Sequence, residues 1–191
     1  MYSNLKKYQV VLASNSPRRK ELLGALGIDF KVQSSLGEET YPNELDCDKV
    51  AEFLAVQKAN WFDDFTANQL YITADTIVLL DNKVLGKPSN SEEAKQTLAS
   101  LSNKTHQVIT AFCIKSKNKL ISKSVVTEVA FSTLSESQID YYIELYKPFD
   151  KAGSYGIQEW IGMIGIEKIN GSYFNVVGLP THELFHELSS F

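Results

Sequence analysis

The stretch LASNSPRRKELL, residues 12–23, ends a hydrophobic run, makes a turn and opens a helix that carries two arginines. Residues 10–12 are apolar and predict a short buried strand. Ser16 is a favourable N-cap, and Pro17 suits the first helical position because no backbone N–H is needed there. The stretch therefore predicts a strand that leads through a tight turn into a helix, as in an α/β sheet, where ligands usually bind at strand ends.

The start of this helix has the features of an anion site. Free N–H groups and the positive end of the helix dipole favour a phosphate, and Arg18 and Arg19 add fork-shaped donors that match phosphate oxygens. The segment alone leaves another interpretation open, in which Arg18, Arg19 and Lys20 are solvated on an ordinary helix. Neither GxxxxGK[ST] nor GxGxxG occurs near the segment, which argues against a P-loop or a Rossmann dinucleotide site.

The bulk properties are those of one soluble domain over residues 1–191. The chain is 43% hydrophobic and 22% charged, which suffices for one sizeable core. A net charge of −4 argues against a general binder of nucleic acids or membrane surfaces. No apolar stretch is long enough to span a bilayer or to act as a secretory signal, so we expect a cytoplasmic protein. Cys47 and Cys113 form no CxxC pair and are expected to be reduced structural thiols.

Hydrophobic periodicity predicts alternating strands and helices along the rest of the chain. Residues 50, 53, 54, 57 and 61 follow helical spacing and should pack on the sheet, with Lys58 off this stripe. Asp75 and Thr76 are expected in the middle of a strand or at a bend. The other expected elements are strands 30–33, 71–73 and 77–80, a turn at 81–82, a helix over 91–101, an antiparallel pair 107–114 and 123–131, and a helix over 135–146 that starts with a capping box. This pattern predicts an α/β sandwich with an elongated mixed sheet.

An ordered series of motifs carries a resemblance that spans nearly the whole chain. LASNSPRRKELL resembles the signature of the Maf family of nucleoside triphosphate pyrophosphatases. The further matches, in the family's order, are GEET at 37–40, LAVQKA at 54–59, ADTIV at 74–78, LGKP at 85–88, DKAGSYGIQ at 150–158 and INGSYFNVVGLP at 169–180. The resemblance implies a fold similar to that of inosine triphosphate pyrophosphatases, and hydrolysis of a nucleoside triphosphate to the monophosphate and pyrophosphate.

Such a reaction needs cations for the phosphates, carboxylates for a divalent metal, and a base. The resemblance makes Asp75 the proton acceptor and places Glu39 and Asp75 near Mg²⁺ or Mn²⁺, which prefer oxygen ligands. Asp75 could instead be a strand-end carboxylate bonded to local N–H groups, and Glu38 and Glu39 could be solvated loop acids. The residues that the resemblance assigns to the phosphates are Ser14, Arg18, Arg19, Lys58 and Lys87.

Three further positions concern the base of the nucleotide. The branch of the family that this chain resembles has Arg, Thr and Gln at the positions of Arg18, Thr76 and Gln158, and prefers dTTP and UTP. The Gln158 amide offers one donor and one acceptor type, which suits the mixed N3–H and carbonyl edge of uracil or thymine. Gln158 could also be an ordinary exposed loop amide.

Two departures from the family pattern stand out. Tyr146-Lys147-Pro148 replaces the usual Gly-Glu-Pro, so that a cation stands where an acidic group is common. Asn103 stands where the family often has glycine before His106, and asparagine tolerates left-handed backbone geometry, so that turn should survive.

Two competing functions remain open. Residues 181–188, THELFHEL, contain a literal HExxH, in which His182 and His186 lie one helical turn apart with Glu183 between them, as in zinc peptidases. No evident third ligand follows, and the apolar residues favour a structural terminal helix. The family is also tied to septum formation and inhibition of cell division, so the chain could act by binding a protein partner; family habit further suggests a homodimer.

Overall fold

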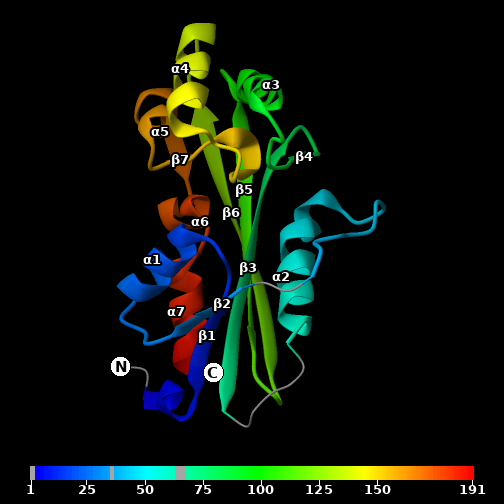
Figure 1. Ribbon diagram of the computed structural model, residues 1–191, viewed down its shortest axis with the longest axis vertical. Helices are drawn as coiled ribbons and strands as arrows, with labels where there is room; N and C mark the ends of the chain where they lie inside the picture. Colours follow the sequence, from blue (N-terminus) through cyan, green and yellow to red (C-terminus); the bar gives the residue numbers. More distant parts are fainter. Residues whose placement is uncertain (1–2, 35–36, 63–67) are drawn as a thin grey trace. The chain divides into compact units, whose positions relative to one another are not determined.

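The computed structural model describes residues 3–34, 37–62 and 68–191. The chain divides into two compact units (Figure 1). The first comprises Met1–Asp75, Thr110–Val125 and Gly178–Phe191, and the second Thr76–Ile109 and Val126–Val177. Three strands continue from one unit into the other along the chain, so the prediction of a single domain over 1–191 stays a prediction.

The first unit is built around β1, which has one parallel neighbour on each side. Strand β1 (Gln9–Ala13) pairs in parallel with β2 (Lys31–Gln33) and with the start of β3 (Gln69–Leu80). Its other elements are the end of β5 (Thr105–Lys115), the start of β6 (Leu120–Phe131), the 3₁₀ turns Ser3–Lys7 and Cys47–Lys49, and the helices α1 (Pro17–Ala25), α2 (Val50–Asn60) and α7 (Thr181–Ser190). Figure 1 shows α1 and α7 on one side of these strands and α2 on the other.

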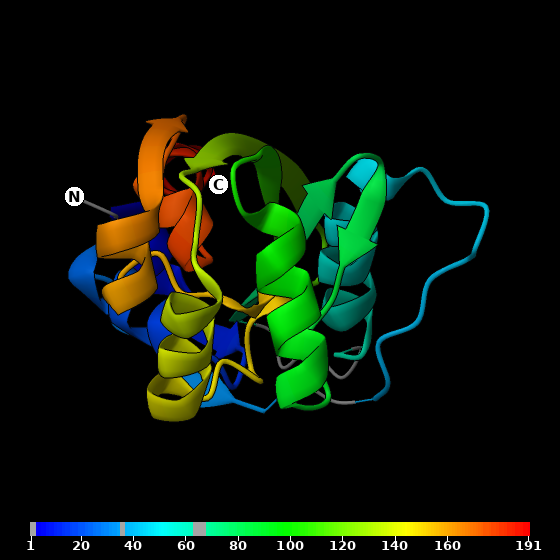
Figure 2. The same cartoon turned by 90° about the horizontal axis from the view of Figure 1, so that it is seen from above.

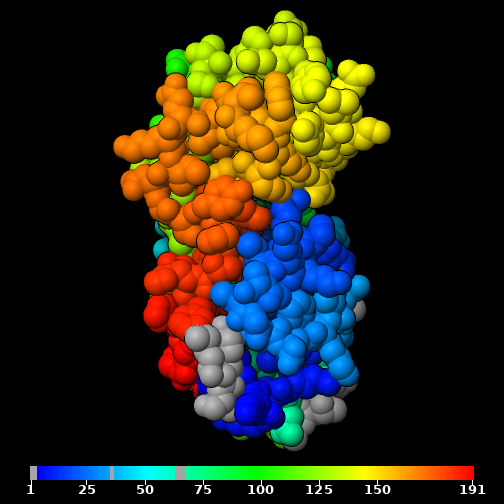
Figure 3. Space-filling view, turned by 90° about the vertical axis from the view of Figure 1, so that its left-hand side faces the viewer, coloured from blue at the N-terminus to red at the C-terminus, as the bar shows by residue number. Residues whose placement is uncertain are grey.

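Helix α1 begins as predicted. The side chain of Ser16 accepts a hydrogen bond from the backbone N–H of Arg19, and Pro17 is the first helical residue. The helix ends at Ala25, and Gly27 follows with a positive φ of 72°, which glycine adopts without strain. In the space-filling view of Figure 3, the blue surface of α1 adjoins the red surface of α7.

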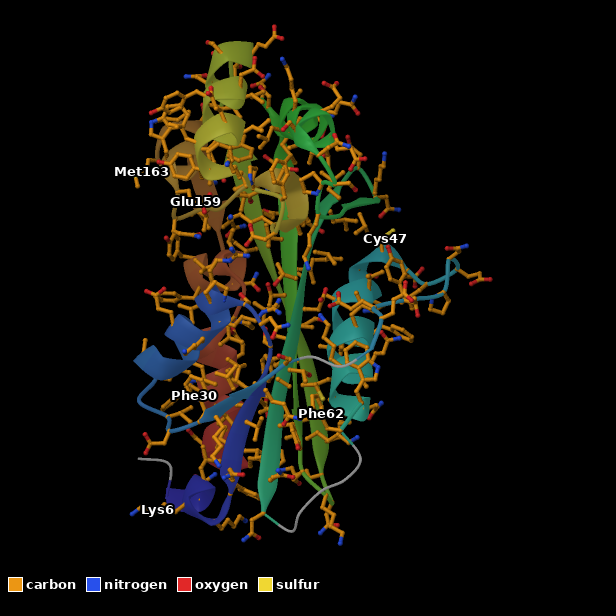
Figure 4. All side chains as sticks on the ribbon, viewed as in Figure 1. Lys6, Phe30, Cys47, Phe62, Glu159 and Met163 are labelled. Carbon is orange, nitrogen blue, oxygen red and sulfur yellow. The ribbon has the colours of Figure 1, made fainter. Side chains whose placement is uncertain are left out.

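Each face of the first unit's strands has its own apolar cluster. Leu23 of α1 and Leu184 and Leu188 of α7 are fully buried in one cluster with residues of β1 and β3. On the α2 side, Phe62, labelled in Figure 4, stacks on Tyr71 with ring centroids 4.5 Å apart. The strands of the first unit thus pack against helices through apolar side chains on both faces. This packing leaves the polar residues at the ends of the strands.

The second unit holds the rest of the sheet and the remaining helices. Helices α3 and α4 pack side by side, as seen from above in Figure 2, and Lys95 of α3 pairs with Glu136 and Asp140 of α4. The elements of this unit are the end of β3, β4 (Lys83–Leu85), α3 (Ser91–Leu101), the start of β5 (Thr105–Lys115), the end of β6 (Leu120–Phe131), α4 (Glu136–Tyr146), a 3₁₀ turn (Ala152–Ser154), α5 (Trp160–Gly165), β7 (Ile166–Asn170) and α6 (Tyr173–Val177).

The seven described strands form a mixed sheet, which confirms the predicted fold class. The order is β2-β1-β3-β5-β6-β7, with β4 pairing to β3. The β1 pairings are parallel, whereas β3–β4 and β6–β7 are antiparallel. Strand β3 runs unbroken through Ala74, Asp75 and Thr76, so these residues lie in mid-strand rather than at a bend. Among the described residues, no helix has the length and apolarity to cross a membrane.

Several local predictions are confirmed. Asp81 and Asn82 have φ values of 49° and 62° in the turn between β3 and β4, and Asn103 has a left-handed φ of 56°. Helix α4 starts with the predicted capping box, in which the Ser135 side chain accepts from the Gln138 N–H and the Gln138 side chain accepts from the Ser135 N–H. Cys113 is buried, and burial raises the pKa of its thiol to about 12, as suits a structural thiol.

His106 is a buried imidazole in the core of the second unit. Its side chain lies 2.8 Å from the Tyr155 hydroxyl and packs against the ring of Phe131. Burial lowers the pKa of His106 from 6.5 to about 4, because the charged imidazolium would lose its hydration. The unfolded chain therefore binds a proton between pH 6.5 and 4 that the folded chain does not bind. Because protonation of His106 favours the unfolded chain, the free energy of unfolding is highest above pH 6.5. It decreases as the pH falls from 6.5 toward 4.

We expect the wild-type chain to lose about 2 kcal/mol more unfolding free energy between pH 7 and pH 5 than the His106→Gln variant. Urea unfolding at the two pH values measures the difference. His182→Gln, the same substitution at an exposed position of α7, is the matched control and should retain the wild-type dependence. Equal losses in the wild type and the His106 variant would rule out the neutral buried imidazole as the source.

Candidate active site

A buried lysine joins two carboxylates in the first unit. The Lys58 ammonium lies 2.5 Å from Oδ1 of Asp75 and 2.9 Å from Oε1 of Glu39. The side chains of Lys58 and Asp75 are 6% and 10% exposed, whereas that of Glu39 is 39% exposed. A charge at such depth is costly unless it is paired, so this arrangement fixes all three groups relative to one another.

Helix α2 brings Lys58 to this position, which corrects the expectation that Lys58 lies off the buried face. The buried face of α2 consists of Val50, Ala51, Leu54, Ala55, Lys58 and Ala59, while Phe53 is 38% exposed. The Thr73 hydroxyl of β3 donates to the carbonyl of Ala55 at 2.6 Å and holds the helix against the strand. Small alanines permit this close approach, and the methylene stem of lysine packs like an apolar residue.

The residue before Lys58 holds the backbone of Thr40, which follows Glu39 in the loop. The Gln57 amide donates to the carbonyl of Thr40 at 2.8 Å and accepts from the N–H of Thr40 at 3.4 Å. Gly37, with a φ of +81°, lies against the Trp61 ring, which leaves little room for a side chain there. Sequence reasoning placed Gln57 and Trp61 on a packing stripe and missed their role in holding the GEET loop, because an amide facing a loop backbone has no periodic signal.

The strand-to-helix turn supplies two more cations. Ser14 is 6% exposed, and its hydroxyl accepts from the N–H of Ser16 at 3.2 Å. Arg19 donates through Nε to the carbonyl of Gly178 at 2.9 Å, so it is anchored rather than freely solvated. Burial lowers the pKa of Arg19; the negative charge of Asp75 opposes this effect and the positive charge of Arg18 adds to it. An arginine with a lowered pKa is still a cation at neutral pH.

The first unit thus gathers most of the predicted site residues. The charges of Asp75, Glu39 and Arg18 all act on the Arg19 guanidinium, and Lys58 contacts both carboxylates. Three cations and two carboxylates lie in this group, beside the N-terminal end of α1 with its positive dipole. Such an arrangement can bind a polyanion and still offer a carboxylate as a proton acceptor.

The donor set fits a hard divalent cation. One Lys58 nitrogen contacts both Glu39 and Asp75, so the two carboxylates are close enough to share a single positive ion. In residues 3–34, 37–62 and 68–191, no group of three or more His, Cys, Asp or Glu side chains could hold a metal. Two carboxylates suffice for Mg²⁺, which usually keeps several waters and binds substrate phosphates as well.

The second unit contains the other predicted site residues. Thr76 follows Asp75 directly in β3, Lys87 is exposed in the loop after β4, and Gln158 lies between η3 (Ala152–Ser154) and α5. The loops of Lys87 and Gln158 are joined, because the Gly153 N–H donates to the carbonyl of Gly86 at 3.2 Å. The Oε1 atom of Gln158 is buried and accepts no hydrogen bond from the described residues, which is unlike an ordinary exposed loop amide.

The HExxH segment is a packing helix, as predicted. Leu184 and Leu188 of α7 are fully buried, whereas His182 and His186 are exposed and contact one another edge to face with ring centroids 4.6 Å apart. Lys147, which replaces the family's acidic residue, caps α4 in the left-handed conformation with a φ of 45°. Tyr146 beside it stacks on Tyr142.

Comparisons with known proteins agree with the motifs. A family model described as Maf-like protein matches residues 9–191. A relative from Phocaeicola vulgatus named dTTP/UTP pyrophosphatase is 55% identical over 98% of this chain and 98% of its own length. A relative of the same name from Parabacteroides distasonis is 51% identical, with 100% of both chains covered.

A solved HAM1 protein from Coxiella burnetii is also similar, with a TM-score of 0.45 and 18% identity over 65% of this chain and 73% of its own. The family match begins at the first residue of β1 and reaches the last residue of the sequence, so it takes in every described residue of the charged group in the first unit. With full-length relatives at half identity or more, this extent shows that the chain belongs to the Maf family.

Proposed function

We propose that this chain is a nucleoside triphosphate pyrophosphatase that hydrolyses dTTP and UTP to the monophosphate and pyrophosphate. The proposal is supported by the names of the full-length relatives and by one observation above all. A buried ammonium, that of Lys58, contacts the carboxylates of Asp75 and Glu39 in a group that also includes Arg18 and Arg19. A protein that only bound a partner would have no need to bury this charge group beside a helix N-terminus.

The cations bind the triphosphate. Arg18 and Arg19 offer planar donors to phosphate oxygens at the start of α1, where Ser14 adds a hydroxyl. Lys58 and Lys87 provide the catalytic positive charge. Their charge stabilises the negative charge that develops on the phosphoryl oxygens and on the departing pyrophosphate.

Asp75 accepts the proton in the hydrolytic step. A water oxygen attacks the α-phosphorus, the bond from that phosphorus to the oxygen that bridges to the β-phosphorus breaks, and pyrophosphate leaves. The proton lost by the water passes to the Asp75 carboxylate, which the Lys58 ammonium orients through Oδ1. Glu39 and Asp75 would hold Mg²⁺ or Mn²⁺, which when bound would neutralise phosphate charge and polarise the phosphoryl group.

Arg18, Thr76 and Gln158 select the base. The buried Oε1 of Gln158, which has no hydrogen-bond partner among the described residues, can accept from the N3–H of uracil or thymine. The amide N–H₂ of Gln158 can donate to a neighbouring carbonyl of the same base edge.

A pyrophosphate-release assay over dTTP, UTP, CTP and GTP with Mg²⁺ or Mn²⁺ tests the proposal directly. We expect UTP and dTTP to be converted to monophosphate and pyrophosphate in equal amounts, because attack is at the α-phosphorus. Release of orthophosphate together with a nucleoside diphosphate would contradict this reaction, and so would the absence of any product.

Asp75→Asn keeps the shape of the side chain but removes the negative charge and the capacity to take a proton. We expect kcat to fall by at least about 10²-fold with the fold intact. Asp81→Asn, the same substitution in the exposed turn after β3, is the matched control and should leave kcat unchanged. A folded Asp75→Asn variant that turns over UTP at the wild-type rate would remove Asp75 from this role.

Chelation should abolish activity reversibly. We expect EDTA to stop pyrophosphate release, and Mg²⁺ or Mn²⁺ to restore it, because the carboxylates of Glu39 and Asp75 would otherwise face the triphosphate without the ion between them. Glu39→Gln should raise the metal concentration needed for half-maximal rate. Full activity of the wild-type chain in EDTA is the contradicting result.

A further inference from the structure

The segment that carries Gln158 is fastened to α4 by a single hydroxyl group. The Tyr142 hydroxyl accepts a hydrogen bond from the backbone N–H of Gly156 at 3.0 Å and donates one to Oε2 of Glu159. Gly156 and Glu159 are the two ends of a turn closed by the Glu159 N–H, which donates to the carbonyl of Gly156 at 3.0 Å. Gln158 lies inside this turn. The Tyr142 side chain therefore holds both ends of the turn that carries Gln158.

A buried ion pair secures the same turn. The Lys151 ammonium lies 3.2 Å from Oε1 of Glu159 and 2.7 Å from Oδ1 of Asp150, and its side chain is only 9% exposed. Both oxygens of the Glu159 carboxylate are therefore engaged, one by Lys151 and one by Tyr142. The carboxylate also covers Gly156, where an added Cβ would lie 2.7 Å from Cδ of Glu159. The turn has little freedom to shift.

Burial raises the pKa of Tyr142 far above its usual value, and the hydrogen bond to Glu159 raises it further. The hydroxyl thus keeps its proton at physiological pH and remains a donor to Glu159. The Tyr142 side chain is fully buried, and its ring stacks on Tyr146 with centroids 5.1 Å apart. Glu159 is labelled in Figure 4, where it lies beside α4.

This network does not include the side-chain oxygen of Gln158. The Oε1 atom of Gln158 is buried and receives no hydrogen bond from the part of the chain that the structure describes, whereas the Tyr142 hydroxyl, the Glu159 carboxylate and the Lys151 ammonium are all paired. A buried unpaired acceptor costs free energy, and a firmly held turn cannot relieve this cost by moving. A ligand N–H is the group that would satisfy it.

We propose that Tyr142 and Glu159, supported by Lys151, are positioning residues for base selection: they hold the Gln158 amide so that its Oε1 accepts the N3–H of a uracil or thymine base. This inference rests on the proposed function. Tyr142 and Glu159 do not touch the nucleotide; they act through Gln158. A pyrimidine without an N–H at N3, such as cytosine, leaves the acceptor unpaired and is rejected.

The ratio of kcat/KM for UTP to that for CTP tests the inference, since the two substrates differ only in the base edge. We expect Tyr142→Phe, which removes one hydroxyl, to lower this ratio about tenfold, the effect of losing a hydrogen bond worth about 1.4 kcal/mol. The loss on UTP should appear mainly in KM. Tyr141→Phe, on the neighbouring and 48% exposed residue of the same helix, should leave the ratio unchanged.

Two further variants separate positioning from general stability. Glu159→Gln retains an acceptor for the tyrosine and should lower the UTP/CTP ratio less than Glu159→Ala does. In the background of Gln158→Ala, Tyr142→Phe should have no further effect on the ratio, because the residue through which it acts is gone. If Tyr142→Phe fails to fold, the two Glu159 variants provide the same comparison.

A folded Tyr142→Phe variant with the wild-type UTP/CTP ratio would overturn the inference, as would equal losses of kcat on both substrates. A further fall of the ratio in the Gln158→Ala background would also overturn it. These outcomes differ from failure of the proposed function, in which the wild-type chain itself releases no pyrophosphate from UTP or does not distinguish UTP from CTP.

Discussion

The buried Lys58 ammonium between Asp75 and Glu39 is the interaction on which the organisation of the first unit depends. Removing one partner of such a pair costs about 3–5 kcal/mol, because the remaining charge stays buried. The neighbouring contacts keep the lysine and its two carboxylates together. Thr73 ties α2 to β3, Gln57 ties the Glu39 loop to α2, and together they keep both carboxylates against one nitrogen.

A buried lysine paired with carboxylates also occurs in the second unit, where it holds a turn. Lys151 is buried between Asp150 and Glu159, and Tyr142 completes the network around the turn of Gln158. By contrast, Lys95 bridges Glu136 and Asp140 at the surface, where water screens the charges and the pair contributes little. Buried charge in this molecule is concentrated where side chains must be held in place, and exposed pairs join helices only loosely.

Much of the local structure could be predicted from the sequence because its causes lie within a few residues. The Ser16 cap and Pro17 start α1, the Ser135 and Gln138 side chains start α4, and the Asp81-Asn82 pair turns β3 into β4. The residues of the charged group in the first unit had been singled out by the motifs rather than by periodicity, and the structure brings them together. The mixed sheet followed from the alternation of apolar runs, which specifies the type of element and the face that it buries.

Tertiary structure alone decided which polar residues are buried and what they hold. Periodicity placed Lys58 outside the buried face of α2 and Gln57 on the packing stripe, and it did not single out Tyr142. Each of these side chains has a hydrogen-bond partner 14 to 17 residues away in the sequence, outside its own helix. The local sequence carries no information about such pairs. The methylene stem of a lysine can be buried like an apolar side chain when a carboxylate pairs with its ammonium group. The sequence by itself therefore determined most of the longer helices and strands, the family motifs and the charge types of the candidate site, whereas packing of distant elements determined which charges meet.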